Sequence, residues 1–186
     1  MTFAASRFAE NGFHPTSVAE IVEGLGVGKG VFYWYFDTKE DLFRAILADA
    51  QLDLRRRQQA ALDTADTPVA RIEQGIRASI EWSLEHAELF RLFQFAATDE
   101  RFSAGLAKGQ RTAVRDAARQ IREAIDAGAI APADPEVLAH AMLGVSSHLV
   151  QMILQGVLSA DGAALDAIID TTVGFCLYGT LGVRDR

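Results

Sequence analysis

The chain has 186 residues, of which 49% are hydrophobic and 23% are charged, and its formal net charge is −7. This length suits one or two small domains with a substantial core. The acidic balance argues against general affinity for polyanions or anionic membranes, so any nucleic-acid binding must come from a local patch. The single cysteine, Cys176, excludes an internal disulfide and a cysteine-rich zinc site and fits a reducing compartment.

The sequence gives little support for a membrane, metal or cofactor site. No run of about 18 consecutive apolar residues and no charged-then-apolar leader is visible, so we expect a cytoplasmic protein that is neither exported nor membrane-bound. An H-x-x-x-H pair, which places two ligands on one helix face, is formed by none of the four histidines: His14, His86, His140 and His148. We therefore predict no bound metal and no cofactor.

Helical spacing starts at the N-terminus, where Phe3, Ala4, Phe8 and Ala9 share one face. The first helix is expected to begin at or before Met1, either because its start is truncated or because the protein is a naturally short form. Residues 1–50 contain four basic and seven acidic side chains, a net charge of −3. That balance is unfavourable for a DNA-binding segment, because neutralisation of phosphates supplies most non-specific affinity.

The pattern of two short helices joined by a glycine turn covers residues 16–36, TSVAEIVEGLGVGKGVFYWYF. Ser17 and Glu20 have the spacing of a capping box, in which each residue satisfies a backbone amide of the other, and this predicts a helix from about Val18. Gly24 and Gly26 are expected to end that helix where the backbone needs a positive φ.

A second helix is expected within four residues of this turn. Val27, Phe32 and Phe36 can pack back against the first helix. The remaining residues are left on an aromatic-rich outer face: Lys29, Gly30, Val31, Tyr33, Trp34 and Tyr35. Two helices joined by so short a turn have the geometry that places the second one in a DNA major groove.

Residues 8–47 resemble the DNA-binding domain of the TetR family of bacterial transcriptional regulators. The positions that match in order and spacing are Phe8, Gly12, Phe13, Thr16, Ser17, Val18, Ile21, Gly26, Val27, Lys29, Gly30, Tyr33, Phe36, Lys39, Glu40 and Leu42. The resemblance implies an all-α fold, with an N-terminal helix-turn-helix DNA-binding domain over residues 1–47 and a C-terminal helical ligand-binding and dimerisation domain over residues 48–186. The chain departs from the family pattern at Gly28, usually serine, and at Arg7, usually apolar.

The same resemblance implies roles for single residues. Those at the places of Lys29, Gly30 and Val31 approach base edges in the family. Those that hold phosphates lie at the places of Ser17, Tyr33, Trp34, Tyr35 and Lys39. The partner implied is double-stranded DNA with a palindromic operator sequence.

The next helix is predicted over residues 39–59, after a cap at Asp37 or Thr38. At 1.5 Å per residue it would be about 30 Å long, enough to join the two domains as a rigid lever. The triplet Arg55, Arg56 and Arg57 near its end suits the negative end of the helix dipole better than a DNA contact. Further helices are predicted over residues 68–86, 99–127, 134–158 and 162–181, whereas residues 89–95 are apolar on nearly every side and fit a helix or a strand.

The last two predicted helices have apolar and small residues on more than one face. A homodimer with a four-helix bundle, made by this helix pair from two chains, would bury the extra face. The interface residues predicted on this basis are Gly144, Ser147, Gln151, Val173 and Gly174. The alternative is that both helices lie at the centre of a monomer.

Aromatic residues are concentrated between residues 82 and 102, and methionines in the helix over 134–158 add adaptable apolar surface. This density predicts a pocket for a small-molecule effector. Its expected lining is Trp82, His86, Phe90, Phe93, Gln94, Phe102, Met142, His148 and Met152. For each polar member taken singly, an ordinary hydrogen bond in the core or at the surface is the favoured role.

The leading hypothesis is a ligand-responsive homodimeric transcriptional regulator, a repressor released from its operator by a small apolar molecule. A helical ligand carrier or sensor without DNA binding is the alternative, which the net charge of −3 in residues 1–50 favours. A helical-bundle enzyme has only the pocket in its favour. The glycine-rich residues 24–30 follow a helix and match neither phosphate-loop motif, and no nucleophile has a recognisable base beside it, so catalysis is not predicted.

Overall fold

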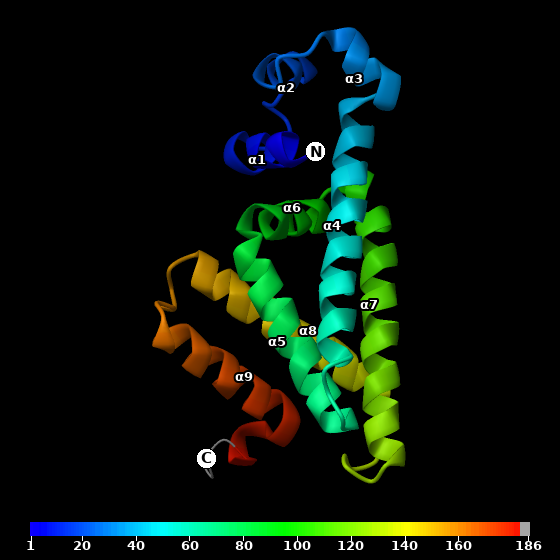
Figure 1. Ribbon diagram of the computed structural model, residues 1–186, viewed down its shortest axis with the longest axis vertical. Helices are drawn as coiled ribbons and strands as arrows, with labels where there is room; N and C mark the ends of the chain where they lie inside the picture. Colours follow the sequence, from blue (N-terminus) through cyan, green and yellow to red (C-terminus); the bar gives the residue numbers. More distant parts are fainter. Residues whose placement is uncertain (183–186) are drawn as a thin grey trace. The chain divides into compact units, whose positions relative to one another are not determined.

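The computed structural model describes residues 1–182 of the chain, and side chains up to residue 179. Within that range all regular structure is helical, which confirms the all-α prediction (Figure 1). The helices are α1 (Thr2–Asn11), α2 (Val18–Gly24), α3 (Lys29–Tyr35), α4 (Lys39–Leu62), α5 (Pro68–Glu85), α6 (Ala87–Thr98), α7 (Glu100–Asp126), α8 (Pro135–Leu154) and α9 (Ala163–Gly182).

The contacts divide the chain into two compact units. The first unit comprises Met1–Asp53 and His86–Gly109, and the second comprises Leu54–Glu85 and the described residues that follow Gly109. Residues 86–109 join the first unit because α6 packs against α1. A boundary of the DNA-binding domain at residue 47 therefore stays a prediction from the sequence, since the compact units are drawn by packing and not by function.

The core of the first unit is built from phenylalanine rings. Phe43 has no exposed surface, and its ring centroid lies 5.3 Å from that of Phe8, 5.0 Å from that of Phe13 and 4.5 Å from that of Phe102. Tilted and edge-to-face rings at these distances attract one another beyond the area that they bury. The residues 89–95 that fitted a helix or a strand are helical, within α6, and Leu92 is buried in this core.

In the second unit α5 packs against both α8 and α9, and α8 crosses behind α5 in Figure 1. Asp134 caps α8 as the sequence predicts, because its carboxylate accepts hydrogen bonds from the backbone N–H groups of Glu136 and Val137. The helix ends at Leu154, before the predicted residue 158, where Gly156 takes a φ of 72° that favours glycine.

One described helix, α8, is long and apolar enough by length and composition to cross a membrane. The expectation of no run of about 18 consecutive apolar residues still holds, because this test averages the hydropathy over the helix. Polar residues such as His140 and Ser147 interrupt every apolar run, yet the average over the helix remains high. The core helix of a soluble protein passes the same test, so this single helix is weak support for a membrane protein.

An ion pair at the start of α7 makes the first unit sensitive to acid. The Arg101 guanidinium donates to both carboxylate oxygens of Asp99, at 2.9 and 2.7 Å, and these hydrogen bonds lower the pKa of Asp99 to about 2. A carboxyl group whose pKa is lower in the folded than in the unfolded chain stabilises the fold above the unfolded pKa, and that stabilisation is lost as the pH falls through the folded pKa. The contribution of Asp99 should therefore be complete above about pH 4 and disappear towards pH 2.

We expect Asp99→Asn to flatten the loss of stability between about pH 4 and pH 2. Asparagine keeps the ability to cap the start of α7, so the charge is what changes. The measurement is urea unfolding at several pH values for both proteins, with Asp126→Asn at an exposed position of the same helix as the control. Parallel pH profiles for the native protein and the Asp99 variant would contradict this expectation.

Candidate functional site

The first helix of the helix-turn-helix is fixed at its start by a cap. The Ser17 hydroxyl accepts a hydrogen bond from the backbone N–H of Glu20 at 3.1 Å, as the capping-box spacing predicts. The Glu20 carboxylate accepts from Arg7 at 2.7 Å and from Asn11 at 3.0 Å, and the Arg7 hydrogen bond is the main reason why the pKa of Glu20 is lowered. Arg7, the departure from the family pattern, thus ties α1 to α2.

The two glycines of the turn have different physical roles. Gly26 has a φ of 67°, the left-handed conformation that favours glycine. Gly24 is helical, so the prediction of a positive φ there is wrong. A Cβ atom at Gly24 would overlap the ring of Phe3, so the close approach of α1 explains the glycine at this position.

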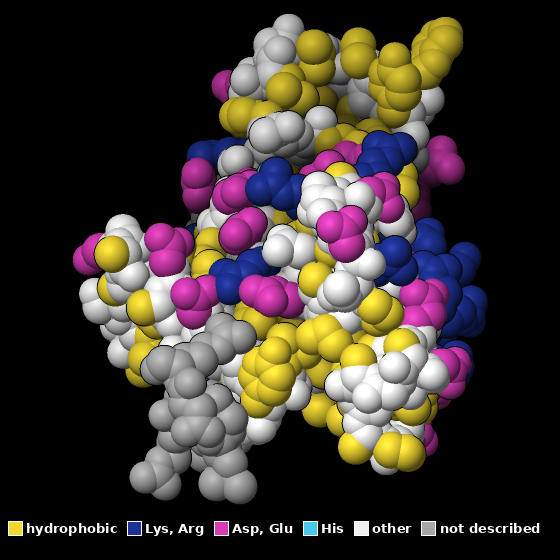
Figure 2. All heavy atoms as spheres, turned by 60° about the horizontal axis from the view of Figure 1, so that its bottom comes forward, with side chains coloured by type: hydrophobic (Ala, Val, Ile, Leu, Met, Phe, Trp, Pro, Cys, Tyr) yellow, Lys and Arg dark blue, Asp and Glu magenta, His cyan; other side chains and the backbone are white. Residues whose placement is uncertain are grey.

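The outer face of α3 is open and aromatic. Phe32 is buried and packs against Phe36, with ring centroids 5.8 Å apart, whereas Trp34 is 85% exposed. Figure 2 shows hydrophobic side chains gathered at its upper end, where α2 and α3 lie in Figure 1. The structure thus brings together on one exposed helix-turn-helix seven of the eight predicted DNA-binding residues: Ser17, Lys29, Gly30, Val31, Tyr33, Trp34 and Tyr35.

Lys39, the eighth, is placed differently. Its ammonium group donates to the backbone carbonyl oxygens of Phe13 at 2.8 Å, His14 at 3.2 Å and Thr16 at 2.8 Å, and it lies 4.4 Å from the centre of the Phe13 ring. These bonds engage all three N–H groups of the lysine. We therefore correct the role of Lys39 from a phosphate anchor to a clamp that holds the turn between α1 and α2.

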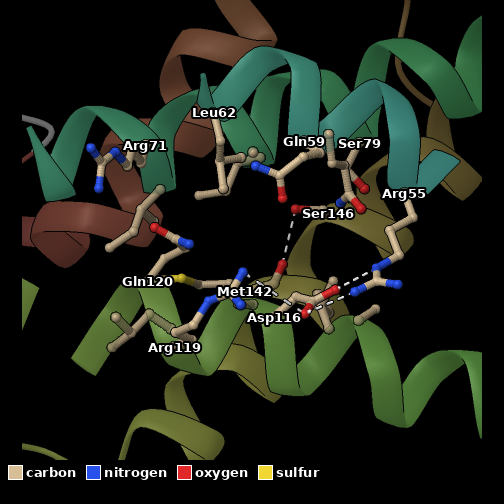
Figure 3. Close-up of a pocket in the computed structure, with 18 residues that line it drawn as sticks. Arg55, Gln59, Leu62, Arg71, Ser79, Asp116, Arg119, Gln120, Met142 and Ser146 are labelled. Atoms are coloured by element: carbon tan, nitrogen blue, oxygen red, sulfur yellow. Dashed lines mark hydrogen bonds and ion pairs between the residues drawn. The ribbon is translucent and has the colours of Figure 1, made fainter. Parts of the chain in front are cut away.

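The second unit contains a cavity of about 90 Å3, shown in Figure 3. Four helices contribute to its wall: α4, α5, α7 and α8. The apolar part of the lining is Leu62, Ile72, Ile76, Ile121, Met142 and Leu143, and the polar part includes Arg55, Arg71, Asp116, Arg119, Gln120 and Ser146. A mostly apolar wall with a few polar side chains is typical of a site for a small molecule.

Of the nine residues predicted to line a pocket, Met142 lines this cavity. Phe102 belongs to the core of the first unit, with Phe93 packed against it, because the rings there fill space with one another. His86, Phe90 and Gln94 also lie in the first unit. In the second unit Trp82 is buried and Met152 is partly buried, whereas His148 is exposed on α8.

Sequence reasoning missed most of the actual lining. Helix α4 continues to Leu62, so Arg55 does not lie at its end, and its guanidinium pairs with Asp116 of α7 at 2.7 Å. A signal was present in the spacing of Arg55, Gln58, Gln59 and Leu62, which places one stripe of α4 on the cavity. No sequence rule indicates which other helix that stripe faces.

The predicted dimer residues separate into two groups. Val137, Ala141, Gly144 and His148 form an exposed stripe at helical spacing on α8, and Gln151, which is partly buried, follows at the same spacing. Ser147 of α8 is partly buried. Val173 and Gly174 of α9 are buried within the single chain, so the prediction that they face a partner subunit is corrected: both pack in the interior of the second unit.

Comparison with known proteins starts from the helix-turn-helix. The profile described as bacterial regulatory proteins, tetR family, matches residues 2–46. The transcriptional regulator RutR of Escherichia coli strain K12 is 28% identical over 150 residues, which cover 80% of this chain and 70% of RutR.

Solved structures share the fold over nearly the whole chain. FadR from Bacillus subtilis in complex with stearoyl-CoA matches with a TM-score of 0.83 at 18% identity and covers 96% of both chains. AibR in complex with isovaleryl coenzyme A and operator DNA matches with a TM-score of 0.74 at 24% identity and covers 94% of both chains. Residues 2–46 thus match the DNA-binding region of the TetR family of bacterial regulatory proteins, and the relatives that match over most of the chain are named transcriptional regulators.

Proposed function

We propose that this protein is a cytoplasmic, homodimeric repressor that binds a palindromic operator and is released by a small-molecule effector. The observation that carries the proposal is the combination of an exposed helix-turn-helix face in the first unit with a partly open, mostly apolar cavity in the second. The relatives support the same reading, because one solved structure holds operator DNA and two hold acyl-CoA molecules.

The DNA contacts are proposed on α3. A Cβ atom built at Gly30 meets nothing within 4 Å, so the backbone beside Lys29 and Val31 is open to a base edge. The hydroxyl groups of Ser17, Tyr33 and Tyr35 and the indole N–H of Trp34 supply donors for phosphates. Lys29 is the sole basic residue in 17–36, so this surface relies on hydrogen bonds and aromatic contacts more than on charge.

A homodimer is supported by the exposed faces of α8 and α9. Val137 on α8 is 62% exposed and Phe175 on α9 is 44% exposed, and small residues such as Ala141 and Gly144 extend the stripe on α8. Small side chains allow close approach of helices, and an isologous contact between two copies would cover these faces. Two-fold symmetry is also what a palindromic operator requires.

The proposed response to the effector is a population shift. Arg55, Gln58 and Leu62 line the cavity, and they belong to α4, the same unbroken helix whose first residue, Lys39, clamps the turn beside α2. An effector that fits the cavity better in one arrangement of α4 stabilises that arrangement. Release from DNA follows if the favoured arrangement moves the two α3 helices of a dimer away from the spacing of successive major grooves.

The test is DNA binding by the protein and by substitutions on α3. We expect Lys29→Ala to cost about 1–3 kcal/mol at one base pair and to flatten discrimination there, because the lysine reads a base edge. Tyr35→Phe should weaken binding to operator and scrambled duplex alike, because it removes a phosphate contact. Fluorescence anisotropy with duplexes from the DNA upstream of the reading frame, at several salt concentrations, measures both effects.

The control is Arg56→Gln, which changes one charge at an exposed position of α4 in the second unit. Half-sites should lie about one helical turn apart or a multiple of it. Failure of the native protein to bind any upstream duplex at low salt would favour a ligand carrier or sensor without DNA binding and would remove the repressor proposal.

A further inference from the structure

The cavity of the second unit has a polar group that no part of the described chain satisfies. The side-chain oxygen of Gln120 is buried and has no hydrogen-bond partner among the described residues. Gln120 lines the cavity, and Figure 3 shows its side chain on the wall formed by α7. Buried acceptors almost always have a donor in folded proteins. The wall therefore favours a ligand that carries an N–H or O–H group.

The rim of the same cavity has an excess of positive charge. Arg55, Arg71 and Arg119 line it, and Asp116 is the single acidic residue among the lining residues, while Arg71 pairs at 3.4 Å with Glu123 outside the lining. Asp116 pairs with Arg55 at 2.7 Å, while the nearest nitrogen of Arg119 lies 4.0 Å from the second carboxylate oxygen. Arg119 is exposed and is held only loosely, which leaves its planar donors available for an anion.

The rest of the wall is apolar. Ile72 and Ile76 of α5 and Met142 and Leu143 of α8 line the cavity without charged groups of their own. Methionine adapts its shape to different apolar groups. One site thus offers an apolar wall, an unsatisfied acceptor and cationic side chains.

We propose that the effector is an amphipathic anion that carries a hydrogen-bond donor. Its apolar part lies against α5 and α8, its N–H or O–H group donates to Gln120, and its anionic group lies at Arg55 and Arg119. The anion competes with Asp116 for Arg55, and this competition weakens the ion pair that joins α4 to α7. This inference rests on the proposed function, in which the cavity is the effector site. It replaces a purely apolar effector by an anionic one.

A matched trio of probes separates these features. N-octanoylglycine has the acyl chain, an amide N–H and a carboxylate. Octanoyloxyacetate replaces the N–H by an ester oxygen, and N-octanoylglycine methyl ester removes the charge. Butanoyl and dodecanoyl versions of all three test the length of the apolar part. Isothermal titration calorimetry on the full chain gives the Kd of each probe.

We expect N-octanoylglycine, or its homologue of best length, to bind about tenfold more tightly than its methyl ester and several-fold more tightly than the ester analogue. Gln120→Leu should abolish the difference between amide and ester, and Arg119→Gln should reduce the difference between acid and methyl ester. Arg56→Gln, an exposed neighbour of Arg55 that does not line the cavity, should change neither. Melting temperatures show that each variant is folded, and Gln120→Leu should not lower this value because it removes an unsatisfied polar group.

Equal affinity for acid and methyl ester, or no binding by any probe at millimolar concentration, overturns the proposal. If the Gln120→Leu variant still binds the amide more tightly than the ester, the proposed hydrogen bond from the ligand to Gln120 is rejected. The proposed function fails separately: a protein that shows the expected probe affinities but binds no upstream duplex keeps this ligand chemistry and is not a repressor. Conversely, if the methyl ester alone releases the protein from its operator, the repressor proposal holds and the proposal of an anionic effector is rejected.

Discussion

Replacement of Val173 by aspartate should prevent the second unit from folding at ordinary temperatures. The Val173 side chain has no exposed surface in the single chain, and an aspartate there is too short to reach water. A buried charge without a partner costs about 3–5 kcal/mol, a large part of the stability of an ordinary domain. Circular dichroism and thermal unfolding of the purified variant measure the loss directly.

The matched control is Val137→Asp, which places the same charge on the exposed stripe of α8. Because Val137 is 62% exposed, this variant should keep the helical content and melting temperature of the native protein as a monomer. If α8 forms the homodimer interface, its mass by analytical ultracentrifugation should be half that of the native protein. If the Val173→Asp variant is instead folded and monomeric, Val173 belongs to the dimer interface and not to the interior of the second unit.

Replacement of Lys39 by methionine should destabilise the first unit by about 2–3 kcal/mol, because hydrogen bonds to charged groups contribute more than neutral ones. Methionine keeps most of the apolar stem, but the carbonyl oxygens of Phe13, His14 and Thr16 lose their donor. Partial exposure of Lys39 lets water replace some of these bonds, which is why the estimate stays below the sum of three. Urea unfolding of the full chain, followed by circular dichroism, is the measurement.

Lys29→Met is the matched control, because Lys29 is exposed on α3. It should leave the free energy of unfolding unchanged and alter DNA binding. The salt dependence of DNA binding distinguishes the two roles of Lys39: a phosphate anchor would reduce the slope of log K against log salt by about one when removed, whereas a clamp would leave the slope of the folded protein unchanged. If the Lys39→Met variant is as stable as the native protein and its slope of log K against log salt is reduced, Lys39 is a phosphate anchor after all.

The sequence by itself determined the features that depend on neighbours within a few residues. The Ser17 cap and the Asp134 cap each join a side chain to a backbone N–H at most three residues away, so their spacing is visible in one dimension. The left-handed turn at Gly26 and the helical stripes follow from the same short range. The helix-turn-helix, and with it the resemblance of residues 2–46 to the TetR family, was predictable for this reason.

Only the tertiary structure decided which helix faces meet. Lys39 reaches carbonyl groups 23 to 26 residues earlier in the chain, and Phe102 packs on Phe43, so neither role is written in local spacing. The same holds for the cavity, whose wall combines Arg55 of α4 with Gln120 of α7 and Met142 of α8. Periodicity shows that a helix has an apolar face, but the partner of that face is chosen by packing among all helices, because burial is non-directional and carries no label of sequence distance.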